Sequence, residues 1–237
     1  MEAQRLEQEA ARLEALKQYR ILDTPPEQTY DDFTLLASFI CEAPIALISL
    51  IDTERQWFKS KVGLEVAETP RAVSFCATIK SPETLIVNDA RLDAQFMSNP
   101  LVTADPDIRF YAGAPLVTPD GHILGSLCVI DRKPRELSES QKRSLEALAR
   151  QVVVQLELRR VSTRLAEALD QIKQMEGLIP ICSYCKGIRD DQGYWSTVEK
   201  FIKQHSDVEF THGICDICLS KNFPEVAAML LKKTEES

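Results

Sequence analysis

The sequence predicts an α+β fold: an antiparallel sheet flanked by helices, followed by a long connecting helix and a small four-cysteine zinc module. Short apolar runs joined by tight turns are typical of antiparallel strands. The flanking segments carry apolar residues at the three- and four-residue spacing of helices. Two Cys-x-x-Cys pairs lie near the end of the chain. The predicted parts are an N-terminal amphipathic helix and linker (1–24), a sheet-containing core (25–137), the long helix (138–177) and the cysteine module (178–237).

Two helices are expected before the first strand. Residues 2–20 place their apolar side chains on one narrow stripe between charged residues, as in an amphipathic helix. We expect the second helix to begin at Thr24, an N-cap residue type that is followed by Pro25 and then Glu27. The predicted buried face of this second helix consists of Phe33, Leu36, Ala37 and Ile40.

Short apolar or alternating runs predict the strands of the sheet. The predicted strands are residues 45–52, 56–62, 85–87, 108–117 and 122–130. The last two flank Thr118-Pro119-Asp120-Gly121, whose residue types suit a tight reversal, so they form a hairpin. Gly113 and Gly125 lie within these strands, where a missing side chain often allows close approach of a ligand or backbone. Residues 65–73 are expected to form a loop, and residues 74–79 to begin a short helix.

The long helix is predicted to begin at a capping box formed by Ser138 and Gln141. No proline or glycine follows until Gly177, and apolar residues recur at helical spacing from Leu145 to Met175. At about 1.5 Å per residue this helix is roughly 55 Å long. Because one small domain cannot cover so long a stripe, we expect its distal half to pair with a second copy of the chain in a homodimer. The alternative is a helix that lies back on its own domain.

Composition excludes some classes of function. The 237 residues are 44% hydrophobic and 27% charged, which is ordinary for a globular protein. The net charge of -8 argues against nucleic-acid binding, which needs clustered basic residues. No export signal is visible and the apolar runs are too short to span a membrane, so a cytoplasmic location is predicted. In a reducing cytoplasm, paired cysteines favour metal binding over disulfides.

The two Cys-x-x-Cys pairs predict a structural zinc site. Two such pairs supply the four thiolates that tetrahedral Zn²⁺ prefers, and a module this small has too little apolar material to fold alone. The predicted zinc ligands are Cys182, Cys185, Cys215 and Cys218, with His205 or His212 as possible replacements. The alternatives are a redox pair or unliganded thiols. We expect Trp195, Val198 and Ile202 to form the small core of the module.

Several ordered blocks resemble the GAF sensor domains of bacterial signalling proteins. They include Ile45–Asp52, Arg55–Ser60, Ser74-Phe75-Cys76, Arg109–Leu116 and Gly125–Asp131. The resemblance implies a small-molecule pocket between the sheet and the loops of one face, and dimerisation through terminal helices. The region around the cysteine pairs is similar to a C-terminal module that follows sensor or receiver domains in bacterial signalling proteins. No catalytic role follows from that similarity.

The resemblance also suggests where a ligand would bind. The candidate pocket residues are Trp57, Phe58, Arg71, Cys76, Arg109, Tyr111 and Cys128. Among them, Arg71 and Arg109 are the residues to test for an anionic ligand. Cyclic-nucleotide-binding members carry an Asp-Glu pair that this chain lacks, and Cys76 is followed by Ala77 and not by the histidine usual in bilin-binding members.

The predicted function is therefore that of a cytoplasmic, dimeric signalling protein. Its GAF domain would bind a small molecule or a partner protein and relay the signal through the helical dimer to a zinc-stabilised docking module. No catalytic constellation or output enzyme domain is visible, so no enzyme activity is expected. The alternatives are a thiol-based reductase of the GAF fold that uses Cys76, Cys128 or the paired cysteines, and a ligandless interaction scaffold.

Overall fold

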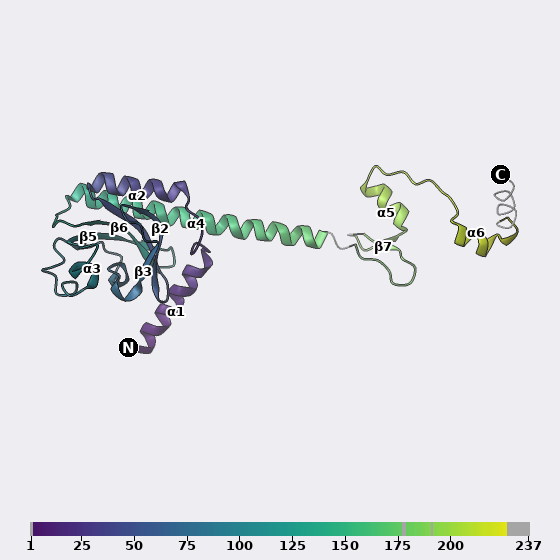
Figure 1. Cartoon of the computed structure of the whole chain (residues 1–237). Helices are drawn as coiled ribbons and strands as arrows, with labels where there is room; N and C mark the ends of the chain where they lie inside the picture. The colour runs from purple at the N-terminus through teal and green to yellow at the C-terminus, as the bar shows by residue number, and fades with distance from the viewer. Residues whose placement is uncertain (1, 177–178, 191, 227–237) are drawn as a thin grey trace. The chain divides into compact units, whose positions relative to one another are not determined.

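The computed structural model describes residues 2–176, 179–190 and 192–226, with the side chains of 6–170, 179–190 and 192–226. The chain divides into two units, Met1–Ala168 and Leu169–Ser237. The first unit holds the sheet, and the second holds the cysteine pairs (Figure 1). Within the described residues, no helix combines the length and the apolar character that a membrane crossing requires.

A six-stranded sheet with the order β3-β2-β1-β6-β5-β4 organises the first unit. The strands are β1 (Ile45–Ile51), β2 (Arg55–Val62), β3 (Glu68–Pro70), β4 (Leu85–Val87), β5 (Phe110–Val117) and β6 (Ile123–Asp131). Every neighbouring pair is antiparallel. β1 and β6 form its centre, and a Cβ atom at Gly125 would collide with the backbone carbonyl of Ser49 on β1. Gly125 therefore allows the two central strands to approach, as its place within a strand predicted.

Helices cover one face of the sheet (Figure 1). They are α2 (Gln28–Cys41) and the first part of α4 (Glu139–Glu176), and α1 (Glu2–Gln18) reaches this face with its C-terminal end. The core beneath them includes Ile48 and Leu50 from β1, Tyr30 from α2 and Leu145 from α4. The C-terminal end of α1 belongs to this core, because Leu16 is only 1% exposed. The sequence predicted this helix but not that its end is buried.

Loops and short helices cover the other face of the sheet. They include η1 (Arg71–Val73), η2 (Cys76–Thr78) and α3 (Pro100–Thr103). A second apolar core lies between them and the sheet, and it contains Phe58, Phe75, Phe96, Tyr111 and Cys128. The sheet thus separates a helix-covered face from a loop-covered face.

The predicted strands are confirmed, with one addition. Residues 65–73 were expected to be a loop, but Glu68–Pro70 form β3, which pairs with Arg55–Trp57 of β2. The segment is short and polar, so its pairing with β2 decides its conformation and its own composition does not.

The predicted start and buried face of α2 need correction. Thr24 is not the N-cap, because the helix begins at Gln28 after Glu27, and the Thr24 hydroxyl donates to the carbonyl of Ile21 instead. The buried residues of α2 are Tyr30, Thr34, Ala37 and Cys41. Leu36 is 46% exposed, because the buried stripe of α2 is shifted by one position and includes Thr34. The Thr34 hydroxyl is hydrogen-bonded to the Ser60 hydroxyl of β2.

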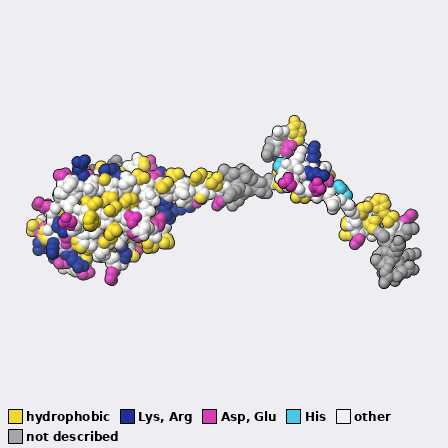
Figure 2. Space-filling model, turned by 90° about the horizontal axis from the view of Figure 1, so that it is seen from above, with side chains coloured by type: hydrophobic (Ala, Val, Ile, Leu, Met, Phe, Trp, Pro, Cys, Tyr) yellow, Lys and Arg dark blue, Asp and Glu magenta, His cyan; other side chains and the backbone are white. Residues whose placement is uncertain are grey.

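Two halves of α4 have different surroundings. Its first turn carries the predicted capping box, since the Gln141 side chain accepts from the Ser138 backbone N–H at 3.0 Å. Side chains from Leu145 to Leu156 then pack on the sheet unit. From Val154 onward, four apolar side chains are more than half exposed: Val154 (57%), Leu158 (60%), Val161 (57%) and Leu165 (59%). Figure 2 shows hydrophobic side chains along this stretch. Ile172, Met175 and Gly177 of the predicted stripe and its end lie outside the described side chains.

Beyond α4, the elements that the structure describes in the second unit are short. They are β7 (Ile188–Arg189), β8 (Trp195–Ser196), α5 (Val198–His205) and α6 (Asp216–Asn222). Trp195 was expected in the core of this unit but is 54% exposed, with the Arg189 guanidinium 5.8 Å from its ring. Ile188 is the buried residue, at 4% exposure. Successive side chains of a strand point to opposite sides, so one side chain of a two-residue strand faces inward. In β7 this side chain is Ile188, and Trp195 lies opposite the outward-facing Arg189.

Candidate functional site

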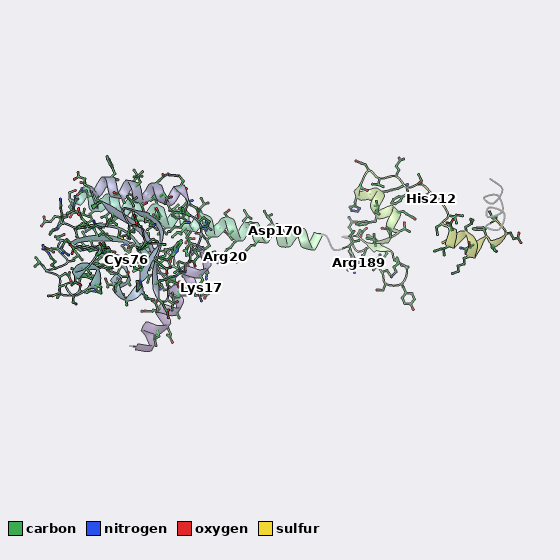
Figure 3. The ribbon with its side chains drawn as sticks, viewed as in Figure 1. Lys17, Arg20, Cys76, Asp170, Arg189 and His212 are labelled. Carbon is green, nitrogen blue, oxygen red and sulfur yellow. The ribbon has the colours of Figure 1, made fainter. Side chains whose placement is uncertain are left out.

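A cleft of about 940 Å³ lies in the first unit beneath α1. Its walls come from Leu6 to Arg12 of α1, from Arg71 to Lys80 around η1 and η2, and from the hairpin between β5 and β6. The cleft combines apolar side chains with charged ones, and its lining includes Cys76, which Figure 3 labels. A second hollow of about 660 Å³ lies between β5 and α4, and none of the sequence-predicted site residues line it.

Two arginines converge on one carboxylate in the cleft beneath α1. The Glu9 carboxylate accepts from Arg12 at 2.7 and 3.0 Å, and from Arg71 at 2.7 Å. Both guanidinium groups are also anchored to backbone, Arg12 on the carbonyl of Ile51 at 2.7 Å and Arg71 on that of Asp52 at 3.0 Å. The hydrogen bond from Arg12, with help from Arg71, lowers the pKa of Glu9 to about 2. Two fixed cations thus hold a single anion at this position.

Cys76 lies at the inner end of the cleft among polar groups. Its Sγ is 3.0 Å from the Ser49 hydroxyl, 3.1 Å from the Tyr111 hydroxyl and 3.5 Å from the Gln56 amide. The Sγ atom of Cys128 is 3.9 Å away. Burial raises the pKa of Cys76, but the hydrogen bonds from the surrounding thiol and hydroxyl groups outweigh it, so the pKa is lowered. The pKa of Cys128 is raised, because its thiol is hydrogen-bonded to Cys76 and is buried.

The interior between the sheet and the loops is filled by aromatic side chains. Phe75 stacks on Phe96 with ring centroids 4.0 Å apart, and its centroid is 5.2 Å from that of Tyr111. Phe58 and Cys128 complete this packing. The open space is therefore at the rim of the loop-covered face, beneath α1.

The seven candidate pocket residues occupy four kinds of place. Arg71 and Cys76 line the cleft, whereas Phe58, Tyr111 and Cys128 lie in the core behind it. Trp57 belongs to the core on the opposite, helix-covered face. Arg109 lies outside the cleft, because its guanidinium pairs with Asp107 at 2.5 Å and donates to the carbonyl of Val102 at 2.8 Å.

Sequence reasoning missed the contribution of α1 to the cleft. Glu9 and Arg12 read as ordinary charged residues of an amphipathic helix, and only the contact with Arg71, which lies 62 positions away, gives them a site. Lys80 and His122 also line the cleft. His122 follows a predicted turn, but no pattern in the sequence connects that turn with the N-terminal helix.

The two cysteine pairs lie on different local structures of the second unit. Cys182 and Cys185 sit on a tight turn closed by the Lys186 N–H, which donates to the Cys182 carbonyl at 3.0 Å, with Lys186 at φ 62°. Cys215 is the N-cap of α6, and Cys218 lies one turn along it. Backbone N–H groups of the same turns lower the pKa values of Cys182 and Cys215.

Each cysteine pair forms a local two-thiol unit. Cys185, Cys215 and Cys218 are exposed, and Cys182 is partly exposed. In the described part of the chain, no three or more His, Cys, Asp or Glu residues are grouped closely enough to hold a metal ion. Cysteine thiols in Cys-x-x-Cys turns are a donor type that fits Zn²⁺.

Comparison with known proteins identifies the fold. The family model of the GAF domain matches residues 25–156. Over 152 residues the chain is 43% identical to the cyclic di-GMP phosphodiesterase PA2567 of Pseudomonas aeruginosa. The aligned region covers 63% of this chain and 26% of that protein. The chain thus spans about a quarter of the length of this relative.

Solved GAF domains have a similar fold. The PixJ GAF domain of Thermosynechococcus elongatus, in its blue-light absorbing form, superposes with a TM-score of 0.50 at 13% identity, covering 67% of this chain and 95% of that one. The GAF domain of an Acinetobacter phosphoenolpyruvate-protein phosphotransferase gives a TM-score of 0.48 at 16% identity, covering 66% and 95%. Since the family model matches more than half of its residues, the chain belongs to the GAF domain family.

Proposed function

We propose that this chain is a signal-sensing regulatory protein whose GAF domain binds a small anionic molecule in the cleft beneath α1. The signal passes through α1 to α4. The observation that carries this proposal is the position of α1, which lines the cleft at Glu9 and Arg12 and accepts from Arg164 of α4 through Gln18 at its other end, at 3.1 Å. Similarity to a protein named a cyclic di-GMP phosphodiesterase supports a signalling role.

The contacts between the end of α1 and α4 provide the route. The Tyr19 hydroxyl donates to Glu157, and the ring of Tyr19 lies 5.3 Å from the Arg160 guanidinium. Arg20, which is labelled in Figure 3, forms an ion pair with Glu167. Because α1 is a single helix, a displacement of Glu9 moves the same rigid element that contacts α4.

Glu9 acts as an internal substitute for the ligand. A carboxylate or phosphate of a bound molecule would take its place on Arg12 and Arg71, and α1 would then lose part of its attachment to the cleft. The ligand shifts the position of α1 only by its difference in affinity between the two arrangements. The Glu9 side chain is 31% exposed, so water screens these ion pairs in part and an ordinary metabolite is able to compete with them.

Replacing Glu9 tests this proposal. With citrate and pyrophosphate as probes, Glu9→Gln is expected to bind one or both roughly threefold to tenfold more tightly than the unchanged chain, because the competing anion is gone. Arg71→Gln is expected to weaken the same binding. Isothermal titration calorimetry measures both affinities. Glu14→Gln is the matched control, since Glu14 lies on α1 but pairs only with Lys17, at 3.7 Å.

The proposal is contradicted if Glu9→Gln binds both probes no more tightly than Glu14→Gln and the unchanged chain do. That outcome would favour a ligandless scaffold, for which the aromatic packing of Phe75, Phe96 and Tyr111 is the supporting observation. A reductase of the GAF fold would instead consume a substrate with reducing equivalents, and we assign no such turnover to this chain.

We further propose that the exposed stripe of α4 pairs two copies of the chain. Its apolar residues from Val154 to Leu165 recur at the spacing of a coiled-coil seam, and a second α4 would cover them. On α2, Leu35 and Phe39 are 60% and 81% exposed and would add to the same helical interface. In such a dimer, a movement of α1 would change how the two α4 helices pack against each other.

We also propose that the four cysteines of the second unit bind one structural zinc ion. Both pairs would supply thiolates, and closing the site would bring the turn at Cys182 and the start of α6 together. Native mass spectrometry is expected to find one zinc ion per chain, and Cys182→Ser or Cys215→Ser is expected to lose it. Cys41→Ser, which changes a buried thiol of the first unit, should retain the metal. Metal-free protein with all four thiols readily alkylated would contradict the proposal.

A further inference from the structure

Cys76 and Cys128 form a pair of buried thiols that the proposed function does not use. They come from different elements, η2 and β6, yet their Sγ atoms are 3.9 Å apart. Cys76 is 3% exposed and Cys128 is fully buried. A disulfide requires a separation of about 2.05 Å, so a side-chain rotation over roughly 2 Å would bring the two sulfur atoms to bonding distance.

The surroundings of Cys76 favour its thiolate. The Ser49 and Tyr111 hydroxyls, at 3.0 and 3.1 Å, and the Gln56 amide, at 3.5 Å, all direct donors at the same sulfur atom. A thiolate accepts such hydrogen bonds much better than a neutral thiol does. The titratable groups in contact with it are Tyr111, whose pKa is raised by burial, and Cys128. Tyr111 therefore remains a neutral donor.

The cleft gives small molecules access to one of the two thiols only. Cys76 lines the cleft beneath α1, whereas Cys128 lies behind it in the core. Thiolate character and access together decide which cysteine an oxidant attacks first. Cys41 offers the opposite case in the same chain, because it lies in the helix-side core and burial raises its pKa to about 11.

We propose that Cys76 and Cys128 are an oxidant-responsive thiol pair that a hydroperoxide converts into a disulfide. The Cys76 thiolate attacks one peroxide oxygen, the O–O bond breaks, and hydroxide leaves, so Cys76 becomes a sulfenic acid. The Cys128 sulfur then attacks the Cys76 sulfur, the S–O bond breaks, and the hydroxyl group leaves with the Cys128 proton as water. The two sulfur atoms supply the two electrons that reduce hydrogen peroxide.

The disulfide would change the floor of the cleft. It would tie η2 to the central strand β6 and remove the acceptor on which the Ser49 and Tyr111 hydroxyls converge. The cleft would then differ between the reduced and the oxidised chain. This redox response is independent of whether the cleft binds an anion.

Peptide mapping of the full chain tests the pair, because trypsin places the three cysteines of the first unit on separate peptides. Cys41 falls on 21–55, Cys76 on 72–80 and Cys128 on 110–132. After graded hydrogen peroxide and alkylation of the remaining thiols, we expect a cross-linked species of 72–80 with 110–132. It should form at a dose at least about tenfold below the one that first modifies Cys41. Dithiothreitol should release the two peptides.

A second variant separates the two chemical steps. In Cys128→Ser, dimedone is expected to trap a sulfenic acid on peptide 72–80 at the same low peroxide dose, since no second thiol is present to displace it. The proposal is overturned if Cys41 is modified at the same dose as Cys76 or at a lower one. It is also overturned if Cys76 of the unchanged chain is oxidised without linkage to 110–132.

Discussion

A chain carrying Leu158→Glu and Leu165→Glu is expected to be a monomer at concentrations at which the unchanged chain is a dimer. The two leucines are 60% and 59% exposed in the single chain and lie on the stripe that a second α4 would cover. Each buried leucine contributes roughly 1.5–3 kcal/mol, and the dimer would lose two from each copy. The dissociation constant should therefore rise on the order of 10⁴-fold or more.

A control variant with the same added charge isolates the stripe. Thr163→Glu and Ala166→Glu add two carboxylates to the same stretch of α4, but on the side of the helix away from Leu158 and Leu165. This variant should remain dimeric. Sedimentation equilibrium over a range of concentrations measures the assembly. An unchanged chain that stays monomeric throughout, or a Leu158/Leu165 double variant with undiminished dimerisation, would show that the stripe is not an interface.

Most strands of the sheet were predictable because their own residues carry a strand pattern. Ile45–Ile51 form an apolar run that is followed by turn residues. The residues between β5 and β6 are of the types that end a strand and form a turn. β3 was missed, because its three residues have no strand pattern of their own and are ordered by pairing with β2. Local patterns thus identify strands that carry their own apolar signal and not those that are recruited by a neighbour.

The candidate site was only half predictable. The family resemblance selected Arg71 and Cys76, which line the cleft, but also Trp57, which lies on the other face of the sheet. Trp57 and Phe58 are adjacent in β2, and alternation sends them to opposite faces. Sequence alone does not say which parity faces the loops. The sequence did not indicate Glu9 as a site residue, because its role depends on the position of α1 at the rim of the first unit.

In the cysteine module the candidate residues were predictable, whereas their arrangement in space was not. Its four thiols are obvious from their spacing, yet each pair is organised only by its own turn, at Cys182 and at Cys215. Closing such a site requires the metal itself, because the surrounding unit has little buried apolar surface. The zinc ligands accordingly remain a prediction, whereas the GAF fold rests on its own cores.

Lys59→Met is expected to destabilise the first unit by about 3 kcal/mol, because it removes one partner from a buried network of charges. The Lys59 side chain is fully buried, and its Nζ donates to Thr24 Oγ1 at 2.8 Å and to the Pro25 carbonyl at 2.7 Å. Its third bond, at 2.6 Å, goes to the Glu27 carboxylate. Methionine has similar length but no donor, so these oxygens would lose the group that satisfies them.

The same network joins Lys59 to α4. Glu27 also accepts from Arg159 of α4 at 2.8 Å, so one carboxylate joins β2, the start of α2 and α4. Urea unfolding followed by the fluorescence of Trp57, which is 7% exposed, measures the loss. Lys61→Met is the matched control: Lys61 lies two positions along the same strand but is exposed, so its replacement should stay within about 0.5 kcal/mol. Equal stability of the two variants would show that the ammonium group of Lys59 does not hold α4 to the sheet.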